Sequence, residues 1–461
     1  MKQSIVLFRQ DLRLLDNPAL AAASDGKILP VFIHDQESLG DWPIGENSQL
    51  WQDAALHALN EQLEQHLHIA SGHSDEILLA LCKQHNITHV YWNRCYEPSR
   101  IKHDTLLKKT LSDAGLSVES FNASLLWEPW TILNQHGESY KVFTPFYRKG
   151  CLASTEPRDI VAVETPLNFI KTQDSELITR QEIKDWDVSE RGAIQQFETF
   201  VAHGLNGYKT LRDFPGKPNT SRLSPYIHWG MISPHTMWHH VKSLVGIVAD
   251  KDIDHFLSEL GWREFSYYQL YHHPTLPHEN WQKKFDHFKW ENNPEHLLAW
   301  QQGKTGIPIV DAAMRELLHT GYMHNRMRMV TASFLIKNLL IDWREGEKWF
   351  WHHLYDADLA SNSASWQWVA GSGFDAAPYF RIFNPILQGK KFDPEGEYVV
   401  RHIPELANLP IKYLFTPWEA PDDILEQAGI VLGQNYPHPI VDLQTSRNEA
   451  LARFKSLGEA Q

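Results

Sequence analysis

The sequence predicts an α/β protein in which an N-terminal doubly wound parallel-sheet domain is joined by a long connector to a C-terminal all-helical domain. Two observations predict it. Apolar runs of strand length alternate with helical patterns over the first 130 residues, and beyond residue 200 the apolar spacing is helical. Strand–helix–strand spacing implies right-handed crossovers and hence a parallel sheet. We predict domains at 1–130 and 201–461, with a connector at 131–200 that carries scattered prolines and charges.

The elements of the first domain follow in chain order. Helical patterns at 49–67 and 74–85 separate short β-rich runs at 5–8, 28–33, 89–92 and 118–121. Ligands of such sheets bind beyond the carboxyl ends of the strands. The loops 9–11 and 93–97 are therefore candidate ligand loops.

The helical part contains one well-defined element. Pro308 begins a run with apolar residues at positions i, i+3, i+4, i+7 and i+8, and Gly321 follows its end. Proline at the first turn and glycine after the last are typical helix boundaries.

Composition limits the classes of function. With 42% hydrophobic and 22% charged residues and no apolar run of membrane-spanning length, the chain is predicted to be a soluble, cytoplasmic monomer without a membrane partner. The net charge of −14 argues against loose coating of nucleic acid, although a local basic patch is compatible with it. The three cysteines show no metal-binding spacing, so no metal is expected. The 18 tryptophans indicate stacking or redox function, with aromatic packing as the alternative.

Three hydroxyls and a guanidinium gather before a predicted helix at 220–225, where Ser224 is the expected N-cap and Pro225 the first helical residue. This is a candidate anion site for a pyrophosphate. An ordinary capped helix is the alternative.

Two further helices carry polar faces. Glu259, Trp262 and Arg263 lie at i, i+3 and i+4, so they line either a polar cavity or an exposed face with a salt bridge. Asn325, Arg328 and Met329 share a face in the same way, with Arg326 turned aside. A strand-like or turning stretch is expected at 356–362, and an acid-free stretch at 376–391 forms a modest basic edge.

Together these segments resemble the photolyase and cryptochrome family over essentially the whole chain, with bacterial class I cyclobutane-dimer photolyases as the most similar members. The segments are FRQDLRLLDNPAL, TSRLSPY, ELGWREF, GYMHNRMRM, DADLASNSASWQW and DAAPYFRIFNP. The resemblance implies a helical domain that holds FAD in its reduced form. It pairs Arg328 with Asp356 beside the flavin ring, lets Asp358 help to hold the ring and places Asn362 against N5. The remaining flavin contacts would be Tyr208, Thr220, Ser221, Arg222, Leu223, Ser224, Trp262 and Arg263.

The implied activity is light-driven splitting of cyclobutane pyrimidine dimers in damaged DNA. A protonated or strongly hydrogen-bonded Glu259 and Asn325 would hydrogen-bond the flipped-out dimer, because the charge it gains with an electron needs donors already in place. Met329 and the rings of Trp262 and Trp368 would pack its apolar side, and Arg212, Arg326, Arg381 and Lys391 would bind the flanking phosphates. Trp366, Trp343 and Trp290 match the chain that reduces the flavin in light, with plain core packing as the alternative.

The antenna and the rival function stay open. Glu97 matches an acidic folate contact, so 5,10-methenyltetrahydrofolate is the first expectation, a deazaflavin the second and no antenna the third; His278 stands where a lysine is expected. The main rival is a blue-light receptor. Asn362 favours repair, because the plant receptors of the family have Asp there. A receptor would also carry a long C-terminal extension, whereas the helical pattern here continues to Phe454.

Overall fold

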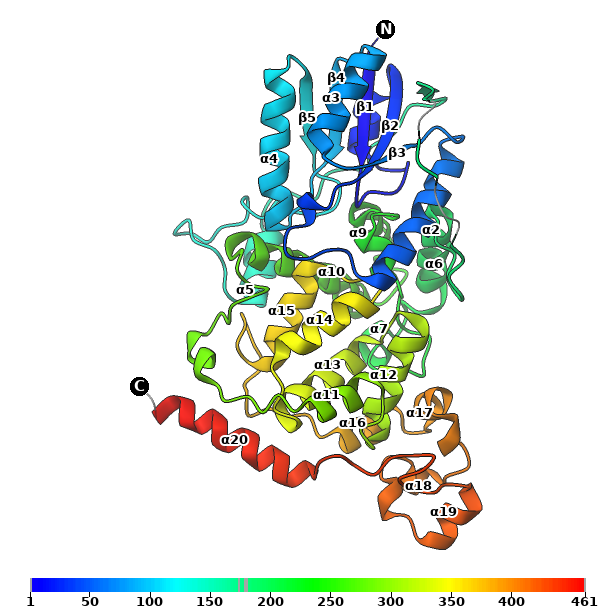
Figure 1. The fold of residues 1–461 in the computed structure, drawn as a ribbon, viewed down its shortest axis with the longest axis vertical. Coiled ribbons are helices and arrows are strands. Elements are labelled where there is room, and N and C mark those ends of the chain that lie inside the picture. Colours follow the sequence, from blue (N-terminus) through cyan, green and yellow to red (C-terminus); the bar gives the residue numbers. More distant parts are fainter. Residues whose placement is uncertain (1, 173–174, 178–180, 460–461) are drawn as a thin grey trace. The chain divides into compact units, whose positions relative to one another are not determined.

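The computed structural model describes residues 2–172, 175–177 and 181–459 (Figure 1). The chain forms two units, which we describe separately. The first comprises Met1–Asn206, Ser221–Pro274 and Asp356–Asp358. The second comprises Gly207–Thr220, Thr275–Tyr355 and Leu359–Gln461. The domain limits predicted at residues 130 and 200 remain a prediction.

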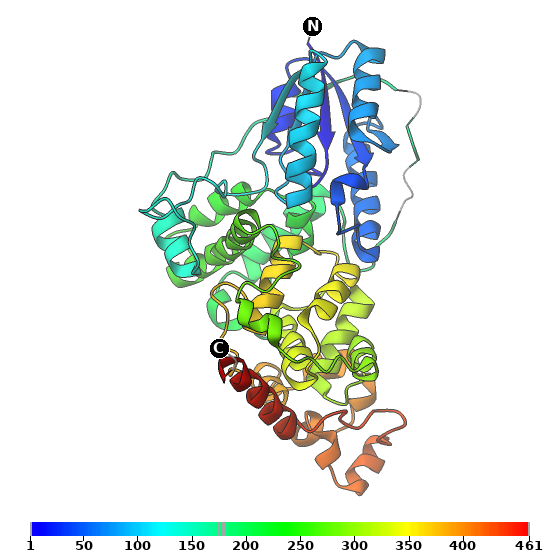
Figure 2. The same cartoon turned by 60° about the vertical axis from the view of Figure 1, so that its left-hand side comes forward.

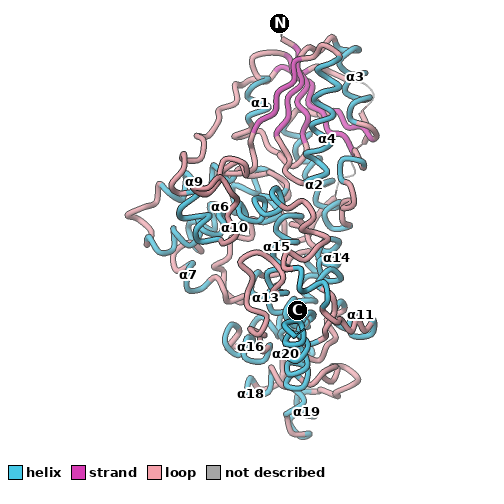
Figure 3. The backbone as a smooth tube through the Cα atoms, turned by 90° about the vertical axis from the view of Figure 1, so that its left-hand side faces the viewer, coloured by secondary structure: helices cyan, strands magenta, loops and turns pink. Residues whose placement is uncertain are grey.

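The described residues of the first unit contain a six-stranded parallel sheet, visible as the magenta strands of Figure 3. Its order is β3-β2-β1-β4-β5, and β6 pairs with the beginning of β2. The strands are β1 (Gln3–Phe8), β2 (Lys27–His34), β3 (His68–Ser71), β4 (His89–Asn93), β5 (Ser117–Phe121) and β6 (Asn168–Phe169).

Helices pack on both faces of this sheet, which confirms the doubly wound prediction. Ile5 and Leu7 of β1 share a buried cluster with residues of α3 (Ser74–His85) and α4 (Pro98–Asp113). Because successive side chains of a strand point to opposite faces, Val6 and Phe8 are buried on the other side. Helix α1 (Pro18–Ala23) contacts β1, β4 and β5.

One predicted helix is too long. The structure places α2 at Glu46–Gln62 and uses Leu67 as the residue before the unpredicted strand β3. The chain turns because Glu64 and Gln65 adopt left-handed φ angles of 53° and 64°. Neither residue is a glycine, so the sequence carries no turn signal there.

Some of the remaining helices of the first unit belong to segments that contact the loop after strand β1. Buried Arg13 donates hydrogen bonds to the carbonyls of Gly230 and Ala123, at 2.8 and 2.9 Å. Gly230 has φ of 65°, and a Cβ there would lie 2.1 Å from the carbonyl oxygen of Gln10. Only glycine allows this approach. The helices are α5 (Phe143–Pro145), α6 (Glu190–His203), α8 (Ser224–His228), α9 (Pro234–Lys242) and α10 (Asp250–His272).

The described part of the second unit is helical. Helix α12 begins at Pro308 and ends before Gly321, whose φ is 63°, as predicted. The turning stretch expected at 356–362 is wrong beyond Asp358, because α15 begins at Leu359. The last helix, α20, is red in Figure 2. The helices are α7 (Tyr208–Leu211), α11 (Pro294–Gln301), α12 (Pro308–Thr320), α13 (Asn325–Ser333), α14 (Trp343–His353), α15 (Leu359–Ala370), α16 (Pro385–Phe392), α17 (Glu397–His402), α18 (Ile411–Leu414), α19 (Asp422–Ala428) and α20 (Leu443–Glu459).

Over the described ranges, no helix is long and apolar enough to cross a membrane. Within the same ranges, no group of three or more His, Cys, Asp or Glu side chains is placed to hold a metal ion. All three cysteines are buried and free.

Candidate functional site

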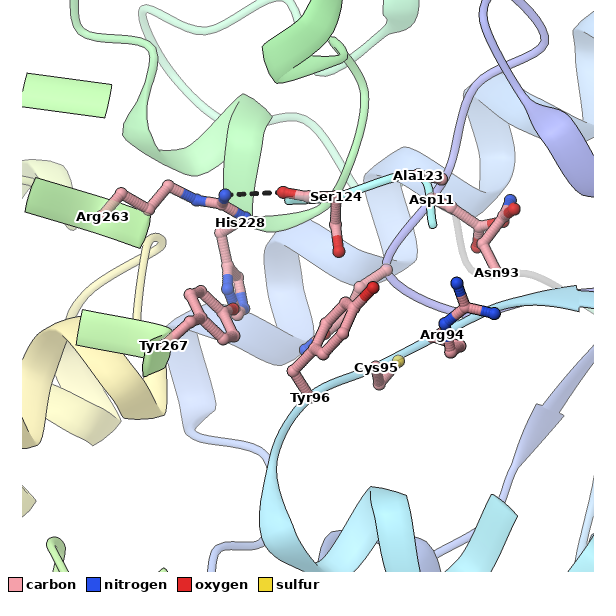
Figure 4. Close-up of a pocket in the computed structure, with 11 residues that line it drawn as sticks. Asp11, Asn93, Arg94, Cys95, Tyr96, Ala123, Ser124, His228, Arg263 and Tyr267 are labelled. Carbon is pink, nitrogen blue, oxygen red and sulfur yellow. Dashed lines mark hydrogen bonds between the residues drawn. The ribbon is translucent and has the colours of Figure 1, made fainter. Parts of the chain in front are cut away.

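A small polar cavity lies in the first unit where the strand order reverses between β1 and β4 (Figure 4). This reversal is the switch point at which open α/β sheets bind ligands. Both predicted ligand loops contribute, through Gln10 and Asp11 and through residues 93–96. The interior has room for about one water molecule. Its lining is Gln10, Asp11, Asn93, Arg94, Cys95, Tyr96, Ala123, Ser124, His228, Arg263 and Tyr267.

The sheet side of this cavity is a fixed hydrogen-bond network. The Asp11 carboxylate accepts the backbone N–H of Arg9 and the amide of Asn93, both at 2.6 Å. Arg9 donates to the carbonyl of Asn93 at 2.6 Å and pairs with Asp104. These bonds hold the two loops together.

Glu97, the predicted antenna contact, begins α4 beside this network. It is 7% exposed, and its Oε2 atom is buried without a hydrogen-bond donor among the described residues. A buried carboxylate oxygen without a donor is costly. It is therefore a place where a ligand can supply a hydrogen bond.

On the opposite side of the cavity, the lining residues His228 and Tyr267 contact Asp358. Figure 4 shows Arg263, His228 and Tyr267 together on this side. The Tyr267 hydroxyl donates to Oδ2 of Asp358, and Nδ1 of His228 lies 3.6 Å from the same oxygen. Burial raises the pKa of the Asp358 carboxyl, but His228, Arg263 and Tyr267 outweigh burial and hold that pKa well below its usual range. Asp358 is thus a buried, ionised carboxylate.

The segment 220–225, which was predicted to bind a pyrophosphate, caps helix α8 differently from the prediction. Helix α8 begins at Ser224 itself, and Leu223 occupies the N-cap position without a side-chain bond. Arg222 has φ of 51°, and its guanidinium carbon lies 4.4 Å from the ring centre of Trp186. Gln196 donates to the carbonyl of Ser221 at 2.8 Å. The backbone is fixed, and the prediction of Ser224 as N-cap is wrong.

The polar face of α10 divides between two surroundings. Trp262 stacks on Phe143 with ring centres 3.7 Å apart. Arg263 donates to the carbonyl of Ser124 at 2.6 Å, toward the cavity. The Glu259 side chain is 29% exposed and lies 3.8 Å from His255.

Asn362 lies on α15 in the second unit and is 8% exposed. Its amide nitrogen donates to the backbone carbonyl of Glu347 at 3.0 Å. The Asn362 carbonyl oxygen is therefore left as the acceptor. Glu347, which carries no signal of burial in the sequence, accepts a hydrogen bond from Ser363, and burial raises the pKa of its carboxyl to about 8.

The three predicted electron-transfer tryptophans lie in the second unit. Trp366 and Trp343 are buried on α15 and α14, and Trp290 is partly buried beside Phe288. A Cβ on Gly346 of α14 would lie 2.1 Å from the Trp366 ring. The indole N–H of Trp343 donates to Asn280 at 2.9 Å. Two members are thus buried, and the third reaches the surface.

The predicted substrate and phosphate residues of the second unit differ in exposure. Asn325 is exposed at the start of α13, and Met329 and Trp368 are partly buried. Arg326 pairs with Asp213 at 2.5 Å. The other residues are placed as follows: Arg381 and Lys391 are exposed, Arg212 lies over the ring of buried Tyr208, Arg328 donates to the carbonyl of Met323, and Thr220 is partly buried.

Comparison with known proteins places these features in one family. Residues 4–165 match the model described as DNA photolyase, and residues 256–456 match the FAD binding domain of DNA photolyase. A deoxyribodipyrimidine photo-lyase of Agrobacterium fabrum is 45% identical over 98% of each chain. Cryptochrome-2 of Arabidopsis thaliana is 35% identical over 100% of this chain and 80% of the relative.

A solved structure agrees with the fold of the whole chain. It is a bacterial class III photolyase from Agrobacterium tumefaciens, with a TM-score of 0.95 and 45% identity, covering 100% of this chain and 98% of that one. The expected similarity to class I enzymes is not confirmed, because this relative is of class III.

Proposed function

Because the chain belongs to the DNA photolyase and cryptochrome family, we propose that it repairs cyclobutane pyrimidine dimers in DNA with light and reduced FAD. The observation that carries repair over a receptor role is Asn362. Its amide nitrogen is occupied by the carbonyl of Glu347, so it presents a neutral acceptor rather than an acid. An uncharged acceptor suits the N5–H of a flavin kept in its reduced form.

The residues fit FAD in their chemistry. Asp358 would supply an ionised acceptor for the flavin ring, and the family resemblance assigns Arg328 and Asp356 to positions beside that ring. The diphosphate and ribityl chain would meet Tyr208, Trp262, Arg263 and the run Thr220, Ser221, Arg222, Leu223 and Ser224. When bound and excited by light, reduced FAD supplies the electron that opens the dimer and takes it back, so there is no net redox change.

The chain's own residues would receive a flipped-out dimer. Exposed Asn325 and partly exposed Glu259 offer hydrogen bonds to its carbonyl and amide edges. The ring of Trp262, held by Phe143, offers a stacking surface, and Trp368 and Met329 offer apolar contact. Stacking and hydrogen bonding of the extruded base are what a base-flipping enzyme requires.

Phosphate contacts would come from a few exposed cations. Arg381 and Lys391 are exposed within a stretch without acids, on a chain whose net charge is −14. Arg212 and Arg326 would add to them. Binding would thus be local, through phosphates beside the lesion.

Two accessory roles complete the proposal. Trp366, Trp343 and Trp290 would carry an electron inward to return the flavin to its reduced form. Glu97, with its buried oxygen lacking a donor, would bind the antenna, for which 5,10-methenyltetrahydrofolate is proposed and a deazaflavin is the alternative. A fluorescence spectrum of the purified protein distinguishes the two.

The test is incubation of the reduced protein with duplex DNA that carries one thymine dimer, with and without blue light. Chromatography of the strands detects repair, and repair that occurs only in the illuminated sample supports the enzyme. Absence of repair in light by the reduced protein, although the oxidised protein reduces its flavin in light, overturns the proposal in favour of the receptor. Asn362→Asp should lose repair, and Asn448→Asp, exposed on α20, should keep it.

A further inference from the structure

Asp358 is a buried carboxylate whose partners come from two other segments of the first unit. Tyr267 belongs to α10 and His228 ends α8. Burial of an ionised carboxylate is costly unless partners compensate it. The identity and placement of these partners therefore decide whether Asp358 can serve as a charged group at all.

The arrangement around Asp358 is specific. Tyr267 donates its hydroxyl to Oδ2, and Nδ1 of His228 lies 3.6 Å from the same atom. The guanidinium carbon of Arg263 lies 5.0 Å from the ring centre of Tyr267 and is itself fixed by the carbonyl of Ser124. Glu97 is a further charged group that acts on Tyr267. Every hydrogen-bonding group in the set is buried or nearly so.

We propose that Tyr267 and His228 are positioning residues for the flavin, which act through Asp358 by holding its carboxylate ionised and oriented, and so set the affinity of the chain for FAD. This inference rests on the proposed function, in which Asp358 holds the flavin ring. Neither residue belongs to the motifs from which the flavin contacts were predicted.

The same geometry predicts an effect on the flavin potential. A negative carboxylate disfavours the anionic reduced flavin, and the Tyr267 hydroxyl withdraws part of that charge. Without the hydroxyl, the carboxylate opposes the reduced form more strongly. The midpoint potential of the bound flavin should then fall.

The adjacent residue supplies a matched control. Tyr268 is also buried on α10, and its hydroxyl donates to the carbonyl of Ile132 at 2.8 Å and accepts the N–H of Tyr140 at 2.9 Å. Tyr268→Phe therefore removes a buried hydroxyl from the same helix without touching Asp358. A purely structural role predicts equal effects of the two substitutions on FAD.

The experiment measures the dissociation constant of FAD and the flavin midpoint potential in the full chain. Tyr267→Phe should weaken FAD binding on the order of tenfold, the effect of one lost hydrogen bond to a charged group. It should also lower the potential, while Tyr268→Phe changes neither. In an Asp358→Asn background, Tyr267→Phe should have no further effect, because a residue that acts through Asp358 cannot act without it.

Equal effects of Tyr267→Phe and Tyr268→Phe, or additive effects in the Asp358→Asn background, overturn the inference. If Tyr267→Phe does not fold, His228→Phe keeps an aromatic ring without the nitrogen near Asp358 and is judged by the same two measurements. If the wild-type chain binds FAD and repairs DNA but the variants do not show the predicted changes in FAD affinity and midpoint potential, only this inference is refuted. A wild-type chain that binds no FAD refutes the proposed function.

Discussion

Substitution of Glu347 by Gln should remove a pH-dependent loss of stability from the second unit. The carboxyl is buried, and burial raises its pKa from 4.5 to about 8, with the Ser363 hydroxyl offsetting only part of the effect. A carboxyl with a raised folded-state pKa binds more protons when folded than when unfolded. Its contribution to stability is complete below pH 4.5 and is lost as the pH rises through 8.

The size of the effect follows from the shift. A change from 4.5 to about 8 corresponds to roughly 5 kcal/mol of unfolding free energy, at about 1.4 kcal/mol for each pKa unit. Gln has no proton to lose. Between pH 5 and pH 8.5 the wild-type unfolding free energy should therefore fall by several kcal/mol more than that of the variant.

Urea denaturation of the FAD-saturated protein at both pH values, followed by tryptophan fluorescence, measures this difference. Glu345→Gln is the control, because Glu345 lies on the same helix with its side chain 43% exposed. If wild type and Glu347→Gln show the same pH dependence, Glu347 is not the buried neutral acid that the structure indicates.

Three further outcomes follow from the second unit. Gly346→Ala places a Cβ 2.1 Å from the Trp366 ring. Overpacking should cost about 1–3 kcal/mol of stability, more than the gain of about 1 kcal/mol in helix propensity, so the melting temperature should fall. An unchanged or higher melting temperature would contradict this. Trp343→Phe should slow light-driven flavin reduction but spare repair by chemically reduced protein, and equal loss of both in flash and repair assays would contradict the electron-transfer role. Asp213→Asn should free Arg326 and tighten DNA binding. The slope of log K against log salt concentration should become steeper by about one ion. An unchanged slope would show that Arg326 does not reach phosphate.

The sequence was sufficient where the signals were local. Alternating strand and helix patterns predicted the parallel sheet, and Pro308 with Gly321 predicted both ends of α12. The rule that ligands bind at strand ends pointed to the loops that line the cavity. Strand β3 was missed because Glu64 and Gln65 turn the chain without glycine or proline.

The partners in the site were beyond local reasoning. Tyr267 and Asp358 are separated by 91 positions in the chain, and only the fold brings them together. Glu347 sits among charged residues on α14 and has the sequence context of an exposed glutamate, yet it is buried. The spacing of Glu259, Trp262 and Arg263 left a polar cavity and an exposed face equally open, and the Glu259 side chain is 29% exposed. Burial depends on tertiary packing, which residue type alone does not determine.

In the proposed function, the reduced flavin would lend an electron to the dimer and take it back. A single light flash on reduced protein with excess dimer-containing DNA, followed by absorbance in the pyrimidine and flavin bands, tests this exchange most directly. We expect the pyrimidine absorbance to rise by an amount that corresponds to at most one repaired dimer per protein, while the reduced flavin spectrum recovers. Lasting oxidation of the flavin, or recovery without any restored pyrimidine, would contradict it.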